Sequence, residues 1–282
     1  MKHTDGYLEV RHTEARGSSK LYEQCWEPEG ECRAAALLVH GLGEHSSRYG
    51  HVAEHLTQRG IALQALDHYG HGKSDGLPGY VERFSVYLDG VAAALEKVQQ
   101  KHPELPLFLV GHSMGGLIAA TFLLQQQNAF RACVLSGPAF KSDQAPPAIV
   151  IAIIRLLAIL VPTMPLLQLD ASGVSRDPVV VDAYMRDPLV HHGKLSARLL
   201  AQMSAAMQSA LARASEIRVP IILMHGEDDQ LTAPSGSVEM YEQVGSEDKT
   251  LKTYPGLYHE IFNEPEQDAV LADMSSWLEA HL

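Results

Sequence analysis

The chain has 282 residues, of which 46% are hydrophobic and 20% are charged, so it is long and apolar enough to fold around a sizeable core and is not of the disordered class. Its net charge of −12 at pH 7 excludes the Lys- and Arg-rich surfaces that bind nucleic acids. The three cysteines form no metal-binding pattern, and their odd number favours a reducing compartment. Because the first ten residues, MKHTDGYLEV, also lack the apolar run of a signal peptide, we expect a cytoplasmic protein.

Short apolar strands alternate with helices along the first half of the chain. We expect strands at residues 7–10, 20–26, 35–41, 61–66, 105–110 and 132–137, the first two of them paired. We expect helices at residues 50–60, 84–102 and 115–127, where apolar residues recur every third or fourth position. The alternation returns near the end, with strands at 221–225 and 250–256 and helices at 237–244 and 266–282. This pattern predicts an α/β fold with a mostly parallel central sheet and helices on both faces.

The alternation stops between about Ala139 and Arg213, where the chain is expected to form only helices and loops. We interpret residues 139–213 as an insertion, called here the cap segment, over a core formed by residues 1–138 and 214–282. In α/β proteins ligands bind at the carboxyl edge of the sheet, and the insertion is expected to cover that edge.

The longest apolar run, AIVIAIIRLLAILVP, extends from Ala148 to Pro162 within the cap segment. It is too short to span a bilayer and has Arg155 at its centre. If it is a helix, Ile153 and Leu157 point away from Arg155. Three interpretations remain open for its apolar face: a core contact, a wall of the substrate pocket, or a transient contact with a membrane surface.

A G-x-S-x-G pattern lies between an apolar strand and a helix, from Gly111 to Gly115. In this context the serine, Ser113, lies on a tight strand-to-helix turn that exposes its hydroxyl above the sheet. The turn also aims the N–H of Met114, at the helix N-terminus, toward a developing oxyanion. The alternative is a serine that only caps the helix, but the apolar strand and the helix on its two sides favour a nucleophile.

A serine nucleophile needs a histidine base and an acid, which follow in the order acid, histidine in this fold. His259 follows the last strand, and three carboxylates follow the strand before it: Glu227, Asp228 and Asp229. These residues alone leave the acid undecided.

A second oxyanion donor is expected from the glycine-rich turn His40–Gly43, and we select the N–H of Leu42. The four histidines in and near this region, His40, His45, His68 and His71, match no metal-ligand pattern. No phosphate-binding loop is present either, so we expect no metal and no cofactor.

Five segments carry a family resemblance: VHGLGEHSSRY, LDHYGHGKSDG, LFLVGHSMGG, LMHGEDDQLT and YPGLYHEIFNE. Together they resemble the monoacylglycerol lipases of the serine α/β-hydrolase superfamily, including bacterial monoglyceride lipases. The resemblance implies the α/β-hydrolase fold with a helical cap, Ser113 as nucleophile, Asp229 as acid and His259 as base. Leu42 and Met114 match the oxyanion-hole positions of the family.

The resemblance also implies hydrolysis of the ester of a monoacylglycerol to glycerol and a fatty acid. Glu44, Arg48 and Tyr184 match positions that help to hold the glycerol end of the substrate. Two alternatives remain: another acyl hydrolase on the same fold (a carboxylesterase, lysophospholipase or thioesterase), or a ligand-binding protein that has lost catalysis. No feature of the sequence predicts an oligomeric state.

Overall fold

The computed structural model describes residues 1–142 and 147–282, so residues 143–146 of the cap segment lie outside the described part. An eight-stranded sheet forms the centre, with the strand order β1-β2-β4-β3-β5-β6-β9-β10. Its strands are β1 (Lys2–Arg11), β2 (Ser18–Glu27), β3 (Ala34–Val39), β4 (Ile61–Leu66), β5 (Leu107–His112), β6 (Ala132–Ser136), β9 (Ile221–Gly226) and β10 (Lys249–Tyr254). β1 and β2 pair antiparallel, β2 pairs antiparallel with β4, and all the remaining pairs are parallel.

The central strands are buried on both faces, and their side chains alternate between two hydrophobic cores. In β3, Leu37 and Val39 face one core, whereas Ala36 and Leu38 face the other. This two-residue period follows from the pleat of a β-strand. The continuous apolar runs that predict these strands are therefore explained by helices on both faces of the sheet.

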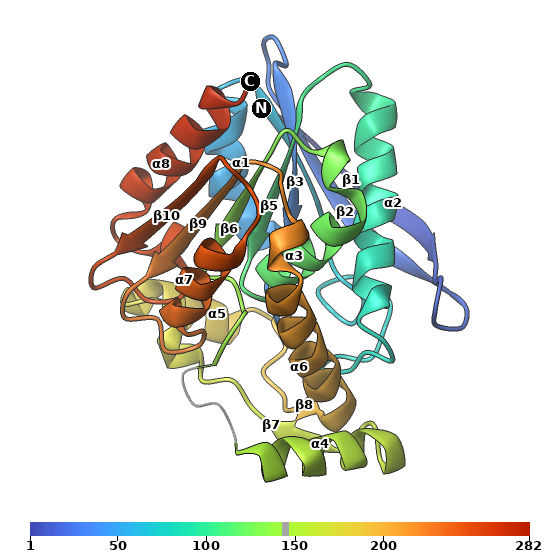
Figure 1. Cartoon of the computed structure of the whole chain (residues 1–282). Helices are drawn as coiled ribbons and strands as arrows, with labels where there is room; N and C mark the ends of the chain where they lie inside the picture. The colour runs from blue at the N-terminus through green and yellow to red at the C-terminus, as the bar shows by residue number, and fades with distance from the viewer. Residues whose placement is uncertain (143–146) are drawn as a thin grey trace.

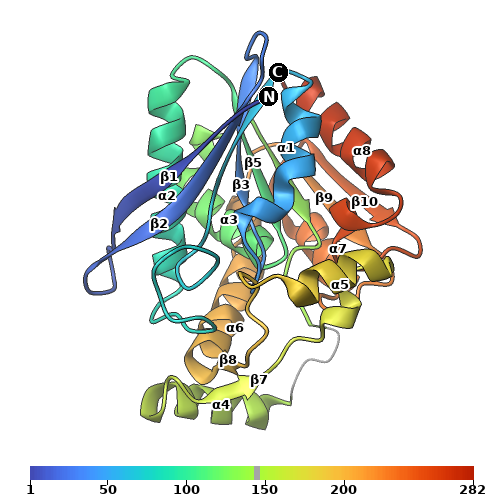
Figure 2. The same ribbon diagram turned by 180° about the vertical axis from the view of Figure 1, so that it is seen from behind.

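The helices divide between the two faces of the sheet (Figures 1 and 2). One face is covered by α2 (Ser85–Lys101), α3 (Met114–Gln126) and α7 (Pro234–Gln243), and the other by α1 (Gly50–Thr57) and α8 (Gln267–Ala280). Short 3-10 helices occur at Ser46–Tyr49 (η1), Gln127–Ala129, Ala171–Gly173, Ala214–Glu216 and Ile261–Asn263. The predicted α/β arrangement is confirmed.

Most of the cap segment lies beyond the carboxyl edge of the sheet, at the bottom of Figure 1. It contains α4 (Ala148–Leu160), β7 (Pro165–Leu167), α5 (Pro178–Arg186), β8 (Leu195–Ser196) and α6 (Ala197–Ala212). The antiparallel pair β7–β8 departs from the prediction of helices and loops only, because strands of three and two residues are too short to show a periodicity. α6 packs into the core beside α3 through Leu199, Met203 and Ala210.

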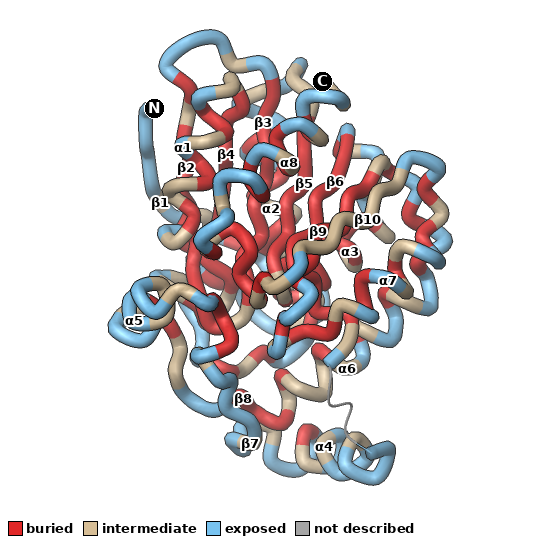
Figure 3. Tube along the Cα trace, turned by 90° about the vertical axis from the view of Figure 1, so that its left-hand side faces the viewer, coloured by how far each residue is buried: buried red, intermediate tan, exposed pale blue. Residues whose placement is uncertain are grey.

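α4 has a different environment from α6. Only Ala158 of this helix is buried, and the remainder is exposed or half-buried, as the pale colour of its trace in Figure 3 shows. Within residues 1–142 and 147–282, no helix combines the length and the apolarity that crossing a bilayer requires.

Candidate active site

Ser113 occupies the turn between β5 and α3. β5 ends at His112, two residues later than the sequence predicts, and α3 begins at Met114, so Ser113 alone forms the connection. Its φ of 54° makes it the one residue other than glycine with a positive φ in the described part of the chain. Such a conformation costs about 1–3 kcal/mol and persists only where the surroundings enforce it. Here the Ser113 N–H donates to the Ser136 carbonyl at 2.9 Å, and its carbonyl accepts from the Ala139 N–H at 3.0 Å.

The glycines on both sides of Ser113 are required by close packing. A Cβ at Gly111 would lie 2.6 Å from the carbonyl oxygen of Gly115, and one at Gly115 would overlap the carbonyl oxygen of Val39. The G-x-S-x-G spacing therefore lets α3 pack directly against the ends of β3 and β5 and holds the turn in its strained form.

The structure brings Ser113, His259 and Asp229 into one hydrogen-bonded chain. Nε2 of His259 lies 2.8 Å from Oγ of Ser113, and Nδ1 lies 2.7 Å from Oδ2 of Asp229. An ionised carboxylate only accepts, so the neutral imidazole carries its proton on Nδ1 and accepts from the Ser113 hydroxyl through Nε2. The three residues follow β5, β9 and β10, all at the carboxyl edge of the sheet.

Asp229 is the member of the acidic turn that contacts the histidine. It is buried, whereas Glu227 and Asp228 are exposed. Its Oδ1 accepts from the N–H groups of Leu231 and Thr232, at 2.8 and 2.9 Å. Burial raises the pKa of Asp229, but His259, His225 and the Thr232 N–H lower it, and the net pKa is well below its usual range. Asp229 is therefore ionised and held in one orientation.

The electrostatic surroundings favour the protonated form of His259. Burial lowers the pKa of His259, but the carboxylates of Asp229, Glu260 and Glu44 raise it, and the net pKa is above the ordinary histidine value. The ring of His112 lies 4.8 Å from the ring of His259. Burial and His259 lower the pKa of His112 to about 4, so its ring is neutral at pH 7.

The backbone N–H groups of Leu42 and Met114 are candidates for an oxyanion hole. Neither donates a hydrogen bond to a protein acceptor within the described residues. Met114 is the first residue of α3, so its N–H carries the positive end of the helix dipole. A Cβ at Gly41, next to Leu42, would lie 3.1 Å from Cβ of Ser113, so the Leu42 loop rests against the serine.

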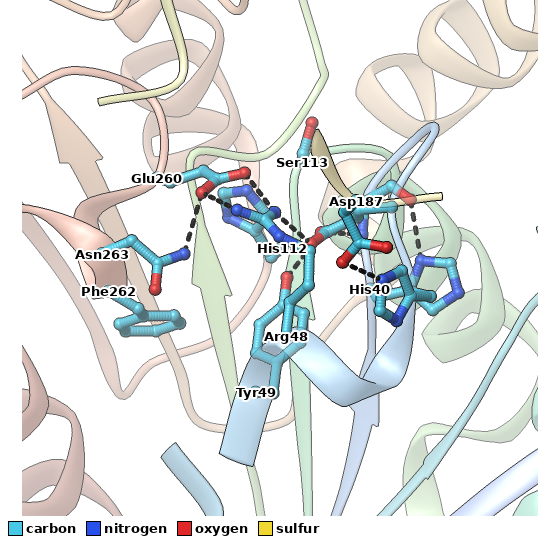
Figure 4. Close-up of polar contacts among 12 residues, drawn as sticks. His40, Arg48, Tyr49, His112, Ser113, Asp187, Glu260, Phe262 and Asn263 are labelled. Carbon is cyan, nitrogen blue, oxygen red and sulfur yellow. Dashed lines mark hydrogen bonds and ion pairs between the residues drawn. The ribbon is translucent and has the colours of Figure 1, made fainter. Parts of the chain in front are cut away.

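Glu44, Arg48 and Tyr184 form a cluster beside this loop, and Figure 4 shows the position of Arg48. Oε1 of Glu44 accepts from the Gly41 N–H and the Tyr49 hydroxyl, both at 2.6 Å, and Oε2 accepts from Arg48 at 2.9 Å. The Arg48 guanidinium lies 4.7 Å from the centre of the Tyr184 ring. Tyr184 comes from α5, so the cap segment contributes to the site.

Three polar residues of the site are absent from the sequence-based prediction. Nε2 of His225 lies 3.1 Å from Oδ2 of Asp229, and the Thr232 hydroxyl donates to the same oxygen at 2.8 Å. Glu260 forms a two-point pair with Arg48 at 2.6 and 2.7 Å. His225 lies one residue before the end of the otherwise apolar β9, and Glu260 follows the predicted base. These two positions were the only signals that the sequence offered for the residues. Within residues 1–142 and 147–282 no group of three His, Cys, Asp or Glu is placed to hold a metal ion.

Comparison of the sequence and the structure with known proteins finds several monoacylglycerol or monoglyceride lipases among the relatives. The family described as serine aminopeptidase, S33, matches residues 30–266. A monoacylglycerol lipase of Mycolicibacterium smegmatis is 40% identical over 94% of this chain and 95% of its own length. The crystal structure of a Paleococcus ferrophilus monoacylglycerol lipase aligns with a TM-score of 0.85 at 32% identity, covering 93% of this chain and 99% of that one. A soluble variant of the Saccharomyces cerevisiae monoglyceride lipase, in complex with a substrate analog, aligns with a TM-score of 0.82 at 27% identity, covering 98% and 96%.

The sheet order, the strained serine turn and the matching family define a serine hydrolase with the α/β-hydrolase fold. Identity to the Mycolicibacterium and Paleococcus proteins extends over nearly the whole of each chain. The chain belongs to the monoacylglycerol lipase family, and it is a carboxylic ester hydrolase.

Proposed function

We propose that this protein hydrolyses the ester bond of monoacylglycerols to glycerol and a free fatty acid through an acyl-enzyme on Ser113. The observation that carries the catalytic part is the hydrogen-bonded chain from Ser113 through His259 to Asp229. The substrate class rests on similarity to the monoacylglycerol lipases named above.

In the first half of the reaction, Oγ of Ser113 attacks the ester carbonyl while Nε2 of His259 takes the hydroxyl proton. Asp229 stabilises the imidazolium that forms. The N–H groups of Leu42 and Met114 bind the oxyanion, each contributing about 3 kcal/mol to transition-state stabilisation. His259 then returns the proton to the departing glycerol oxygen. In the second half, a water molecule activated by His259 attacks the acyl-enzyme and releases the fatty acid.

The alcohol end of the substrate is proposed to lie beside Glu44, Arg48 and Tyr184. The Tyr184 hydroxyl is the freest of these groups, since it forms no hydrogen bond with another side chain among the described residues. It lies close to the Leu42 loop, where a Cβ at Gly43 would be 3.6 Å from it. Glu44 and Arg48 have most of their polar atoms bound to each other and to neighbouring groups. A glycerol hydroxyl would therefore meet Tyr184 first and the remaining lone pair of Glu44 second.

Residues 139–213 are proposed to act as a cap that shields the acyl chain from water. Each methylene removed from water contributes about 0.8 kcal/mol to the free energy of binding. Enclosing even part of a fatty acyl chain among apolar side chains therefore supplies a large share of that free energy. The short polar end then fixes the position of the ester at Ser113.

The outer helix of the cap, α4, is proposed to contact a membrane surface. Six of its large apolar side chains are exposed, and four of them form a stripe at helical spacing: Ile149 (67% exposed), Ile153 (49%), Leu156 (54%) and Leu160 (67%). Arg155 lies away from this stripe and donates to Gln208 of α6 at 3.3 Å. Because the net charge is −12, the contact is proposed to depend on apolar insertion between lipids rather than on anionic headgroups.

The substrate proposal is tested by comparing initial rates across ester classes. The set is a long-chain monoacylglycerol, its di- and triacylglycerol counterparts, a lysophospholipid and p-nitrophenyl butyrate, assayed with wild type and Ser113→Ala. We expect kcat/KM for the monoacylglycerol to exceed that for the other lipids by about ten-fold or more. An equal or higher value with lysophospholipid or diacylglycerol would reject the monoacylglycerol assignment and leave a broader esterase.

A further inference from the structure

Buried charges connect the loop that carries His259 with the loop that carries Leu42. Glu260 follows His259, and its two carboxylate oxygens accept from Nη1 and Nη2 of Arg48 (Figure 4). The same Nη1 also donates to Glu44. A two-point pair between guanidinium and carboxylate fixes orientation as well as distance. The base loop is therefore tied to η1, where Arg48 lies.

The other end of this chain of contacts holds the backbone beside Leu42. Oε1 of Glu44 accepts the N–H of Gly41 at 2.6 Å, and it is itself fixed by the Tyr49 hydroxyl at 2.6 Å. Since Gly41 also lies against Cβ of Ser113, little space remains for its peptide to shift. Any movement of Glu44 would be passed to the peptide that precedes the Leu42 N–H.

Fold stability does not explain these three side chains well. The side chains of Glu44 and Glu260 are 4% and 5% exposed, and they share a single cation, so the cluster carries a net negative charge. Burying such a cluster has a desolvation cost that its internal attraction often only just offsets. A geometric role accounts better for its presence between two loops of the active site.

We infer that Glu260, Arg48 and Glu44 are positioning residues that set the distance between the imidazole of His259 and the N–H of Leu42. The inference rests on the proposed functions of Ser113, His259 and Leu42. It gives Glu44 and Arg48 an effect on every ester, including esters that have no glycerol, and it assigns Glu260 a role in the same reaction.

The same charges face the base, and this gives a second readout. The groups that act on His259 are the acidic Asp229, Glu260 and Glu44 and the neutral His112, and Arg48 is paired with Glu260 and Glu44. His225 lies behind Asp229, and Asn263 donates to Glu260. The charge of Glu260 raises the pKa of His259, so removing that charge lowers the pKa. Because neutral His259 is the active form, the acid limb of the pH profile then moves to lower pH.

The primary test is Glu260→Gln, assayed on p-nitrophenyl butyrate, which has no glycerol. We expect kcat to fall about ten-fold or more, as misplacement of reacting groups does, while KM stays within about two-fold. We also expect a lower midpoint in the pH profile of kcat/KM. The matched control is Glu23→Gln, because Glu23 is also buried and paired with a lysine, Lys97, but lies on β2 away from the site. The control is expected to retain wild-type kcat and pH midpoint.

A second variant, Arg48→Lys, keeps the charge and removes the two-point geometry. We expect kcat to fall while the pH midpoint stays near that of wild type, which separates position from charge. Thermal unfolding of each variant shows whether it is folded. If Glu260→Gln does not fold, Arg48→Lys decides, and wild-type kcat in that variant overturns the inference.

Two further results would overturn the inference. One is wild-type kcat and pH midpoint in folded Glu260→Gln. The other is a variant, Glu260→Gln or Arg48→Lys, in which only KM for a monoacylglycerol increases and kcat is unchanged. That result would make Glu44 and Arg48 substrate contacts only. Failure of the proposed function would give different results from failure of this inference. It would appear as a low rate of wild type on monoacylglycerols, or as full activity of Ser113→Ala.

Discussion

Nε2 of His259 lies 2.8 Å from Oγ of Ser113, although 146 residues separate them in sequence. The contact exists because β5 and β10 run in the same direction and end at the same edge of the sheet. Ser113 reaches the histidine from a strained turn with a φ of 54°, and the strain supplies the first prediction.

Replacing Ser113 with glycine is expected to stabilise the fold relative to replacing it with alanine. Both variants lack the hydroxyl, but alanine keeps the Cβ that disfavours a positive φ, whereas glycine does not. Strain of this kind costs about 1–3 kcal/mol, of which the greater freedom of glycine in the unfolded chain offsets about 0.4–1 kcal/mol. Thermal unfolding measures the difference. An alanine variant as stable as the glycine variant would show that the turn is not strained.

Asp229→Asn is expected to reduce kcat on p-nitrophenyl butyrate far more than Asp228→Asn does. The amide cannot stabilise the imidazolium of His259 and favours the wrong tautomer, which lowers kcat by up to about 10⁴ in the serine-protease example. Asp228 is exposed and serves as the matched control one residue away. A larger loss in Asp228→Asn would place the acid at that residue instead.

The pH profile of kcat/KM is expected to rise through one ionisation with a midpoint above about 6.5, the ordinary histidine value. Burial lowers the pKa of His259, but Asp229, Glu260 and Glu44 together raise it by more than burial lowers it, so the protonated form persists to higher pH. Since only the neutral ring accepts the Ser113 proton, activity is lost as pH falls through this raised pKa. The measurement is a series of initial rates in free enzyme at low substrate. A flat profile, or a midpoint well below 6.5, would contradict a base paired with Asp229.

Aspartate in the exposed stripe of α4 is expected to abolish binding to vesicles while leaving catalysis on a soluble ester unchanged. The variants are Ile153→Asp and Leu160→Asp, because Leu157 proves to be half-buried and is the poorer probe. Burying two such side chains contributes about 1.5–3 kcal/mol each. Co-sedimentation with phosphatidylcholine vesicles and hydrolysis of p-nitrophenyl butyrate are measured together.

Val238→Asp is the control for the membrane experiment, since Val238 is an exposed apolar residue of α7. It is expected to sediment with vesicles as wild type does. Unchanged sedimentation of the α4 variants would reject the membrane contact. Unfolding of these variants, with loss of both vesicle binding and ester hydrolysis, would also reject it and would indicate a packing role for the stripe.

The helices of the core were predictable from their periodicity, and the central strands from continuous apolar runs bounded by other residue types. The predicted strand at 61–66 has the bounds of β4, where six consecutive residues are buried. The turn that carries Ser113 was predictable from its two glycines, since Gly111 and Gly115 are required by close packing around Ser113. β7 and β8 were not, because two or three residues carry no usable pattern.

The polar network around the site was largely beyond sequence reasoning. Arg48 and Glu260 are 212 residues apart, and no local pattern couples a charge in η1 to a charge after β10. His225 differs, since a histidine near the end of an apolar strand is unusual enough to notice. Its pairing with Asp229, however, depends on the geometry of the turn between the two residues. Pairings of this kind are set by tertiary contacts rather than by propensity or periodicity.

The central claim is that Ser113 is the nucleophile activated by His259, and covalent labelling measures it most directly. The protein is incubated with a fluorophosphonate, digested and analysed by mass spectrometry, alongside Ser113→Ala and His259→Gln. We predict one phosphonylated peptide, containing Ser113, no adduct in Ser113→Ala, and labelling slowed by about a thousand-fold or more in His259→Gln. Labelling at another residue, or none in folded wild type, would contradict the assignment of Ser113.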